Sequence, residues 1–112
     1  MKGLAVRWSL REASPDAAER LTDYVADSSH PRFEGMAGLR FKTWRMRAGE
    51  WFEGCYVFES DEARAAFQEG FTPGAAASPV SELVGSAPIL IEPFAVVGVA
   101  EGGAGFVSSP RG

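Results

Sequence analysis

Aromatic side chains are spread along this chain at positions from which they could wall a pocket for a flat molecule. Three tryptophans are a high content for only 112 residues. The candidate pocket residues are Trp8, Trp44, Tyr56 and Phe58, with Trp51 as a further one. Aromatic residues on strands more often pack in a core than line a site, so both roles stay open for each of them.

Ionisable side chains could give such a pocket its chemistry. A cation would stabilise an anionic ligand, and a base would accept the proton that the ligand loses. The candidate catalytic residues are Lys42 as the cation and His30, the only histidine, as the base, with Arg7 and Glu53 as alternatives. Each also has a structural interpretation. An imidazole in a loop after a helix is usually solvated, and we expect Lys42 to form an ion pair with Glu53 across a hairpin.

Other reactive groups indicate no further chemistry. Cys55 lies in the middle of a predicted strand without a nearby histidine, which is typical of a small buried side chain rather than a nucleophile. As the only cysteine it cannot close an internal disulfide or share a zinc site with a second thiol, so we predict a reducing compartment and no structural metal. The glycines of segment 102–105 precede no helix, so they do not predict a nucleotide site.

Length and composition indicate one small globular domain with a single two-layer core, because a chain of 112 residues is too short for separate cofactor and substrate domains. A net charge of −4 argues against nucleic acid as a partner. The longest apolar run, Phe94–Ala100, is far shorter than the roughly 20 residues that cross a bilayer. The early charges at Arg7 and Arg11 leave no apolar segment for a secretory signal. We therefore expect a cytoplasmic protein with no membrane partner.

In the first half of the chain, periodicity predicts a strand, a helix and a hairpin. Apolar residues alternate from Leu4 to Leu10, which indicates a strand. A helix is expected to begin at Pro15 and to end around Ser28, because Pro31 cannot continue it. Segments 39–46 and 51–59 are expected to pair as a hairpin.

In the second half, a cap at Ser60 predicts a helix that runs to about Glu69, followed by a loop over segment 72–78. A short helix is expected from Pro79 to its end at Gly85. Segment 89–100 then predicts a long apolar strand. Because Pro93 cannot donate a hydrogen bond to a neighbouring strand, this strand should lie at a sheet edge or contain a bulge.

The register of the hairpin decides which side chains share a face. If Ala48 and Gly49 form its loop, Leu39, Phe41 and Thr43 lie with Gly54, Tyr56 and Phe58. The second face then carries Arg40, Lys42, Trp44 and Met46 with Trp51, Glu53, Cys55 and Val57. So many large apolar groups on a second face predict that another copy of the chain covers it.

The element order strand, helix, strand, strand, helix, short helix, strand predicts a ferredoxin-like α+β fold. In this βαββαβ arrangement an antiparallel four-stranded sheet carries its helices on one face. We expect this domain to span residues 1–101 and residues 102–112 to form a flexible Gly/Ser-rich tail. Two open sheet faces packed together would make a dimeric α/β barrel.

The segment Gly38–Trp44, the segment Gly54–Phe58 and the Ala-rich helix with Ala63 and Phe67 together resemble the YdhR-like monooxygenase family of the dimeric α/β-barrel superfamily. In that family a Gly-Leu/Phe-x-x-Lys-x-Trp strand is followed by a Gly-Gly-x-Tyr-x-Phe strand and an Ala-rich helix. This chain has Glu53 where the family has the first glycine of the second strand.

The resemblance implies a homodimer and a monooxygenase that needs no cofactor and acts on a small aromatic or polyketide-like substrate. Such a substrate must itself supply electrons to oxygen, which requires a dry aromatic pocket and a base. Two alternatives stay open. One is a small-molecule-binding protein without catalysis, and the other is a haem-linked protein, for which His30 would be the only imidazole ligand.

Overall fold

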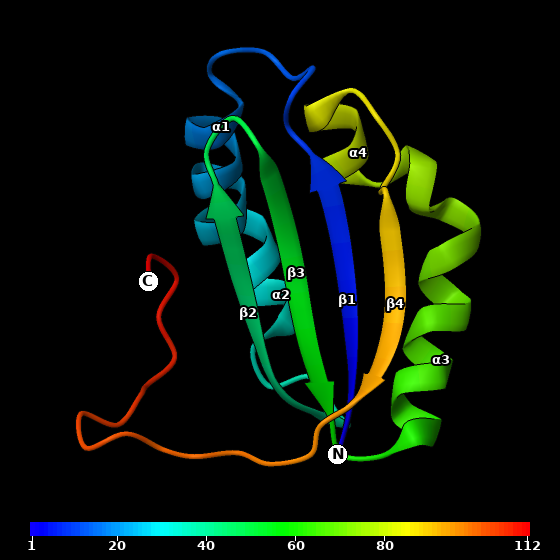
Figure 1. The fold of residues 1–112 in the computed structure, drawn as a ribbon, viewed down its shortest axis with the longest axis vertical. Coiled ribbons are helices and arrows are strands. Elements are labelled where there is room, and N and C mark those ends of the chain that lie inside the picture. The colour runs from blue at the N-terminus through cyan, green and yellow to red at the C-terminus, as the bar shows by residue number, and fades with distance from the viewer.

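The computed structural model describes residues 1–112 and confirms a ferredoxin-like α+β fold. Its core element is a four-stranded antiparallel sheet with the strand order β2-β3-β1-β4 (Figure 1). The strands are β1 (Lys2–Ser9), β2 (Leu39–Arg47), β3 (Trp51–Phe58) and β4 (Leu90–Ala95). The first and last strands of the chain therefore lie side by side.

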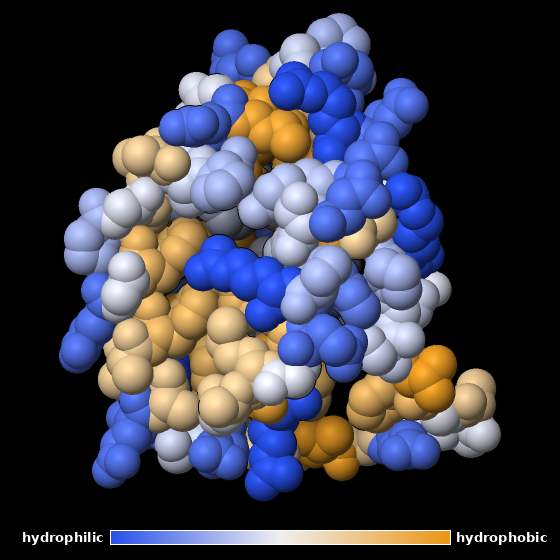
Figure 2. Space-filling view, turned by 180° about the vertical axis from the view of Figure 1, so that it is seen from behind, coloured by the Kyte–Doolittle hydropathy of each residue, from blue (hydrophilic) through white to orange (hydrophobic).

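Two groups of helices cover one side of the sheet. The first group is α1 (Ala17–Tyr24) and α2 (His30–Phe33), which lie over β2 and β3 (Figure 1). The second group is α3 (Asp61–Phe71) and α4 (Pro79–Val84), which lie near β1 and β4. Figure 2 shows this side, where hydrophobic side chains gather in the middle and a strongly hydrophilic side chain crosses them. None of the helices has the length and apolar content needed to cross a bilayer.

The first helical segment continues beyond the predicted end at Ser28. A π-helical turn, Val25–Ser29, joins α1 to α2, and the backbone N–H of His30 donates to the carbonyl of Val25. The prediction was wrong because it treated Pro31 as a stop. Proline lacks an N–H and crowds the carbonyl four residues earlier in a regular α-helix, and a locally wider turn relieves both problems.

The other helix limits differ from the predictions by a few residues. The first helix begins at Ala17 instead of Pro15, and α3 continues to Phe71 instead of Glu69. Segment Thr72–Ala77, predicted as a loop, is a 3-10 helix. The short helix α4 is confirmed: the Ser78 hydroxyl accepts a hydrogen bond from the N–H of Ser81, and Gly85 ends the helix at φ 89°.

The pairing of β2 with β3 differs from the predicted register by one residue. Arg47 lies opposite Trp51, so the loop has three residues, Ala48-Gly49-Glu50, rather than two. Gly49 adopts φ 76°, which glycine tolerates without strain, and the N–H of Glu50 donates to the carbonyl of Arg47 over 2.9 Å. A shift of one residue moves every side chain to the opposite face relative to its partner strand.

The predicted faces of the hairpin are therefore wrong. Lys42, Trp44 and Met46 lie under the helices, on the same face as Phe52, Gly54, Tyr56 and Phe58. The open face instead carries Phe41, Thr43 and Arg45 with Trp51, Glu53, Cys55 and Val57.

The predicted ion pair between Lys42 and Glu53 is wrong for the same reason. The Glu53 carboxylate is almost fully buried on the open face, where it accepts from Arg7 Nε over 2.9 Å and from Arg45 Nε over 2.6 Å. The Arg7 guanidinium also lies 4.2 Å from the centre of the Trp51 ring. Glu53 thus ties the three strands β1, β3 and β2 together across the middle of the sheet.

The core lies between the sheet and the helices, as the alternation in the first strand predicts. Its largest contributors are side chains of β1 and β3 and single residues of the helices. They include Leu4, Val6, Trp8, Leu21, Phe33, Phe52, Tyr56, Phe58 and Val84.

The last strand lies at the edge of the sheet, which confirms the positional prediction from Pro93. It ends at Ala95, which lies opposite Lys2 at the start of β1, and not at Ala100. The chain then leaves the sheet. Phe106 lies 6.3 Å from the ring of Phe41, and the Ser108 hydroxyl lies 3.0 Å from Nε2 of His30.

We expect Glu53→Ala to lower the free energy of unfolding by about 2–4 kcal/mol, because it leaves two arginines without their shared buried partner. Urea denaturation measures the change. Glu50→Ala is the matched control, since its ion pairs with Arg11 and Arg47 lie at the surface and should contribute less than about 1 kcal/mol. Equal losses in the two variants would contradict the prediction.

Candidate functional site

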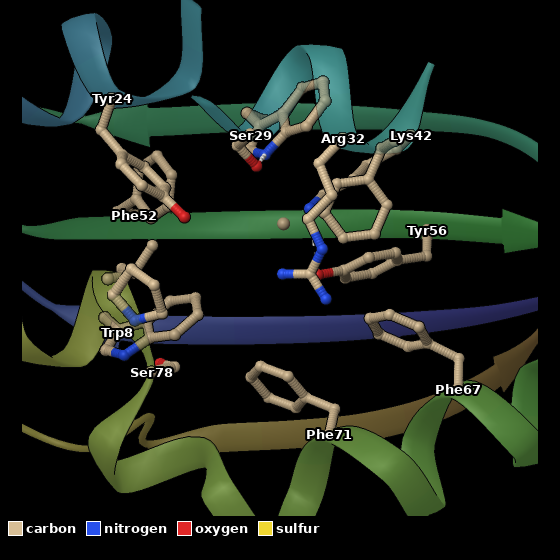
Figure 3. A pocket seen from close by; sticks show the side chains of 15 residues that line it. Trp8, Tyr24, Ser29, Arg32, Lys42, Phe52, Tyr56, Phe67, Phe71 and Ser78 are labelled. Atoms are coloured by element: carbon tan, nitrogen blue, oxygen red, sulfur yellow. Dashed lines mark hydrogen bonds between the residues drawn. The ribbon is translucent and has the colours of Figure 1, made fainter. Parts of the chain in front are cut away.

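A small cavity lies between the two helix groups and the sheet. Its volume is about 40 Å³, which is room for a few water molecules. The walls come from strands β1, β2 and β3, from the end of α1 with the π-helical turn and α2, and from α3 and the start of α4 (Figure 3). The lining is mostly aromatic and includes Trp8, Tyr24, Phe33, Trp44, Phe52, Tyr56, Phe67 and Phe71.

Lys42 brings the only amine to this cavity, and aromatic rings enclose it. Its Nζ lies 3.6 Å from the ring centre of Phe33, 4.2 Å from that of Tyr56 and 4.5 Å from that of Trp44. Nζ also donates a hydrogen bond to the Tyr56 hydroxyl over 3.0 Å. Removal of water from around the amine lowers the pKa of Lys42 well below its ordinary value, and the nearby positive charge of Arg32 lowers it further. A lowered pKa makes the neutral form of this amine, which can accept a proton, easier to reach.

Tyr56 is held on the floor of the cavity with its hydroxyl beside Lys42. Burial raises the pKa of Tyr56 above its ordinary value, so the phenol keeps its proton. The ring lies 4.8 Å from that of Phe67. Gly54 leaves room for this arrangement, because a Cβ there would lie 3.2 Å from Cε of Lys42 and 3.3 Å from Cε1 of Tyr56.

The two cavity tryptophans are held by one hydrogen bond each. Trp44 Nε1 donates to the Ser29 hydroxyl over 3.0 Å, and Trp8 Nε1 donates to the Ser81 hydroxyl over 2.9 Å. Ser29 belongs to the π-helical turn and Ser81 to α4. Each helix group is therefore fastened to the sheet beside the cavity by a side chain of a strand.

Of the predicted pocket residues, Trp8, Trp44 and Tyr56 line the cavity together with Lys42. Phe58 does not line it; its ring is parallel to that of Tyr56 at 6.0 Å, deeper in the core. His30 also lies outside the lining, on α2 behind Trp44, with ring centres 5.9 Å apart. The alternatives Arg7 and Glu53 and the further aromatic residue Trp51 lie on the open face of the sheet.

Several cavity residues have no counterpart in the sequence analysis. Ser29, Arg32 and Phe33 reach the cavity only because the helix continues through Pro31. The spacing of Ser29 and Phe33, four residues apart, is the helical signal that could have indicated this continuation. Phe67 and Phe71 have the same spacing on α3.

The cavity contains an amine, a guanidinium, hydroxyls and aromatic faces, but no carboxylate. No three His, Cys, Asp or Glu side chains of the chain come together as a metal site would require. The chemistry available from these residues is proton transfer to and from Lys42 and binding of an anion between aromatic walls.

No protein-family model matches the chain, and no curated protein matches it. The fold is similar to the crystal structure of NE2512, a protein of unknown function from Nitrosomonas europaea. The TM-score is 0.67 at 22% identity, and the match covers 88% of this chain and 91% of the other. Rv0793 from Mycobacterium tuberculosis is less similar, with a TM-score of 0.49 at 14% identity over 89% of this chain and 96% of the other. The similarity to NE2512 shows a shared fold.

We expect the pH dependence of stability to reveal the lowered pKa of Lys42. The unfolded chain binds a proton at this site up to pH 10.5 and the folded chain releases it at lower pH. Folding is therefore penalised below the folded-state value, and the wild-type protein regains this stability as the pH rises toward 10.5.

Lys42→Met removes this titration. Relative to the variant, the wild-type protein should thus gain free energy of unfolding between pH 7 and pH 10, measured by urea denaturation. Lys2→Met is the control, since Lys2 is exposed at the start of β1. A constant difference between wild type and Lys42→Met over this range would contradict the lowered pKa.

Proposed function

We propose that this chain is a small-molecule-binding protein that oxidises a small aromatic or polyketide-like substrate as a monooxygenase without a cofactor. One observation carries the proposal: a lysine amine with a lowered pKa is enclosed by three aromatic rings and bonded to a tyrosine hydroxyl, inside a cavity. The resemblance of segment 38–67 to the YdhR-like monooxygenase family supports it, and its Lys42, Trp44 and Tyr56 meet at this cavity.

In the proposed reaction the amine of Lys42, in its neutral form, takes the proton of a phenolic hydroxyl of the substrate. The ammonium that forms stays beside the phenolate and stabilises its charge, and the Tyr56 hydroxyl remains protonated as a further hydrogen-bond donor. The aromatic walls exclude water, so the anion keeps its reactivity.

The electrons for oxygen come from the substrate. A ring CH₂ conjugated with the phenolate is converted to a carbonyl, and dioxygen supplies the carbonyl oxygen and one molecule of water. The substrate loses four electrons, and dioxygen gains four. This balance requires neither a flavin nor a metal.

A second candidate is a protein that binds the same ligands without catalysis. The position of His30 favours it, because this histidine lies outside the cavity and leaves Lys42 as the only base there. Stoichiometric binding of a phenol without oxygen consumption would indicate this function.

We further propose a homodimer in which the open sheet faces pack together. No helix covers this face, and the partly exposed side chains of Phe41, Trp51, Cys55 and Phe94 lie on it. A second sheet would remove these groups from water and complete a dimeric α/β barrel.

Oxygen uptake tests the catalytic proposal, with 1,8-dihydroxyanthrone, which has a ring CH₂, as the probe. Lys42→Met should lower kcat/KM by about 10²–10⁴, because the positioned base is lost. Lys2→Met keeps the same change of residue type at an exposed site and should retain full activity. Unchanged turnover in Lys42→Met, Trp44→Ala and Tyr56→Ala would show that the reaction does not occur in this cavity.

Sedimentation at micromolar concentration tests the dimer. Thr43→Arg places a charge on the open face at an exposed position and should shift the protein from dimer to monomer. Thr22→Arg makes the same change on the outer surface of α1 and should leave the dimer intact. A monomeric wild-type protein would refute the proposal.

A further inference from the structure

The charged residues that line the cavity are basic, although the chain as a whole is acidic. The chain has 15 acidic and 11 basic side chains. The only charged residues that line the cavity are nevertheless Arg32 and Lys42, both basic. Neither forms an ion pair, whereas these arginines all do: Arg7, Arg11, Arg45, Arg47, Arg64 and Arg111.

The two basic side chains reach the cavity from different elements, Lys42 from the sheet and Arg32 from a helix. Lys42 rises from β2 among the rings on the floor, and Arg32 reaches down from α2 (Figure 3). The Arg32 guanidinium lies 5.1 Å from the ring centre of Phe33 and extends toward the Tyr56 hydroxyl. Burial is the main cause of the shifted pKa values of Lys42 and Tyr56, and the positive charge of Arg32 lowers the pKa of both groups. When Lys42 carries a proton, it and Arg32 place two positive charges in one small, largely apolar space, and an anion between them turns their repulsion into attraction.

We propose that the cavity takes an aromatic carboxylic acid that also carries a phenolic hydroxyl, with the carboxylate bound by Arg32 and the hydroxyl directed to Lys42. This inference rests on the proposed function and narrows its substrate class. A guanidinium presents a planar pair of donors that matches the two oxygens of a carboxylate, whereas the single amine of Lys42 suits one hydroxyl. The ring would lie against the aromatic side chains that line the cavity.

The position of the Arg32 side chain also determines how much space the cavity has for a ligand. The cavity of about 40 Å³ is too small for an aromatic ring while the guanidinium points into it. Arg32 is an exposed residue and has no ion-pair partner to hold it, so its side chain is free to rotate outward. An incoming carboxylate would draw the guanidinium to the mouth of the cavity and make space for its own ring.

Calorimetric binding of three matched probes tests the inference: 3-hydroxy-2-naphthoate, 2-naphthol and 2-naphthoate. The wild-type protein should bind 3-hydroxy-2-naphthoate at least about tenfold more tightly than 2-naphthol, since a charged hydrogen-bonded pair contributes this much or more. In Arg32→Gln the two affinities should become equal within about twofold. Arg32→Lys keeps the positive charge but loses the planar pair of donors, so part of the preference for the carboxylate probe should remain.

Arg20→Gln is the matched control, because Arg20 is an exposed arginine on the neighbouring helix α1 without an ion pair, and it should bind like wild type. Equal wild-type affinity for 3-hydroxy-2-naphthoate and 2-naphthol, or a preference that survives in Arg32→Gln, would overturn the inference. If 2-naphthol binds in a Lys42-dependent way without any carboxylate preference, the proposed site stands and only the role of Arg32 fails. If none of the three probes binds, both proposals fail.

Discussion

The register of the β2–β3 hairpin decides where the charges of this protein lie. With Arg47 opposite Trp51, Lys42 comes to lie opposite Tyr56 beneath the helices, and Glu53 comes to lie between two arginines on the other face. Every buried ionisable group then has a specific environment: the carboxylate has two cationic partners, and the amine has rings and a hydroxyl. A pairing shifted by one residue would place Lys42 on the open face and leave the cavity without its amine.

The helical segment that contains Pro31 forms a wall of the cavity to which the β2–β3 hairpin contributes Lys42, Trp44 and Tyr56. Its π-helical turn brings Ser29 to the indole of Trp44 and sets Arg32 and Phe33 over the amine of Lys42. A helix that stopped at Ser28 would leave the amine open to water, and its pKa would then stay near that of an ordinary lysine. π-Turns are uncommon and cost backbone energy, and they are frequent at functional sites, which agrees with the position of this one at the wall of the cavity.

Local signals in the sequence were sufficient for the fold, and they failed where a single residue or a single turn decided the outcome. Alternation in β1, the caps at Ser60 and Ser78 and the proline of β4 each act within a few residues, so the elements and their order could be predicted. The length of the loop around Gly49 and the passage of a helix through Pro31 depend on tertiary packing, which no local pattern contains. The candidate site was therefore predicted only in part: Lys42, Trp8, Trp44 and Tyr56 line the cavity, while His30 and Phe58 do not.

The three tryptophans lie in three different electrostatic environments, so the fluorescence of each one depends on different surroundings. The indoles of Trp8 and Trp44 line the cavity, each with its N–H bonded to a serine hydroxyl, and Trp44 also faces the Lys42 amine. Trp51 lies on the opposite side of the sheet beneath the Arg7 guanidinium. A change of charge or solvation in the cavity would perturb the emission of the first two indoles and leave that of Trp51 unaltered. The fluorescence of Trp51 and that of the two cavity tryptophans therefore respond to events on opposite faces of the sheet.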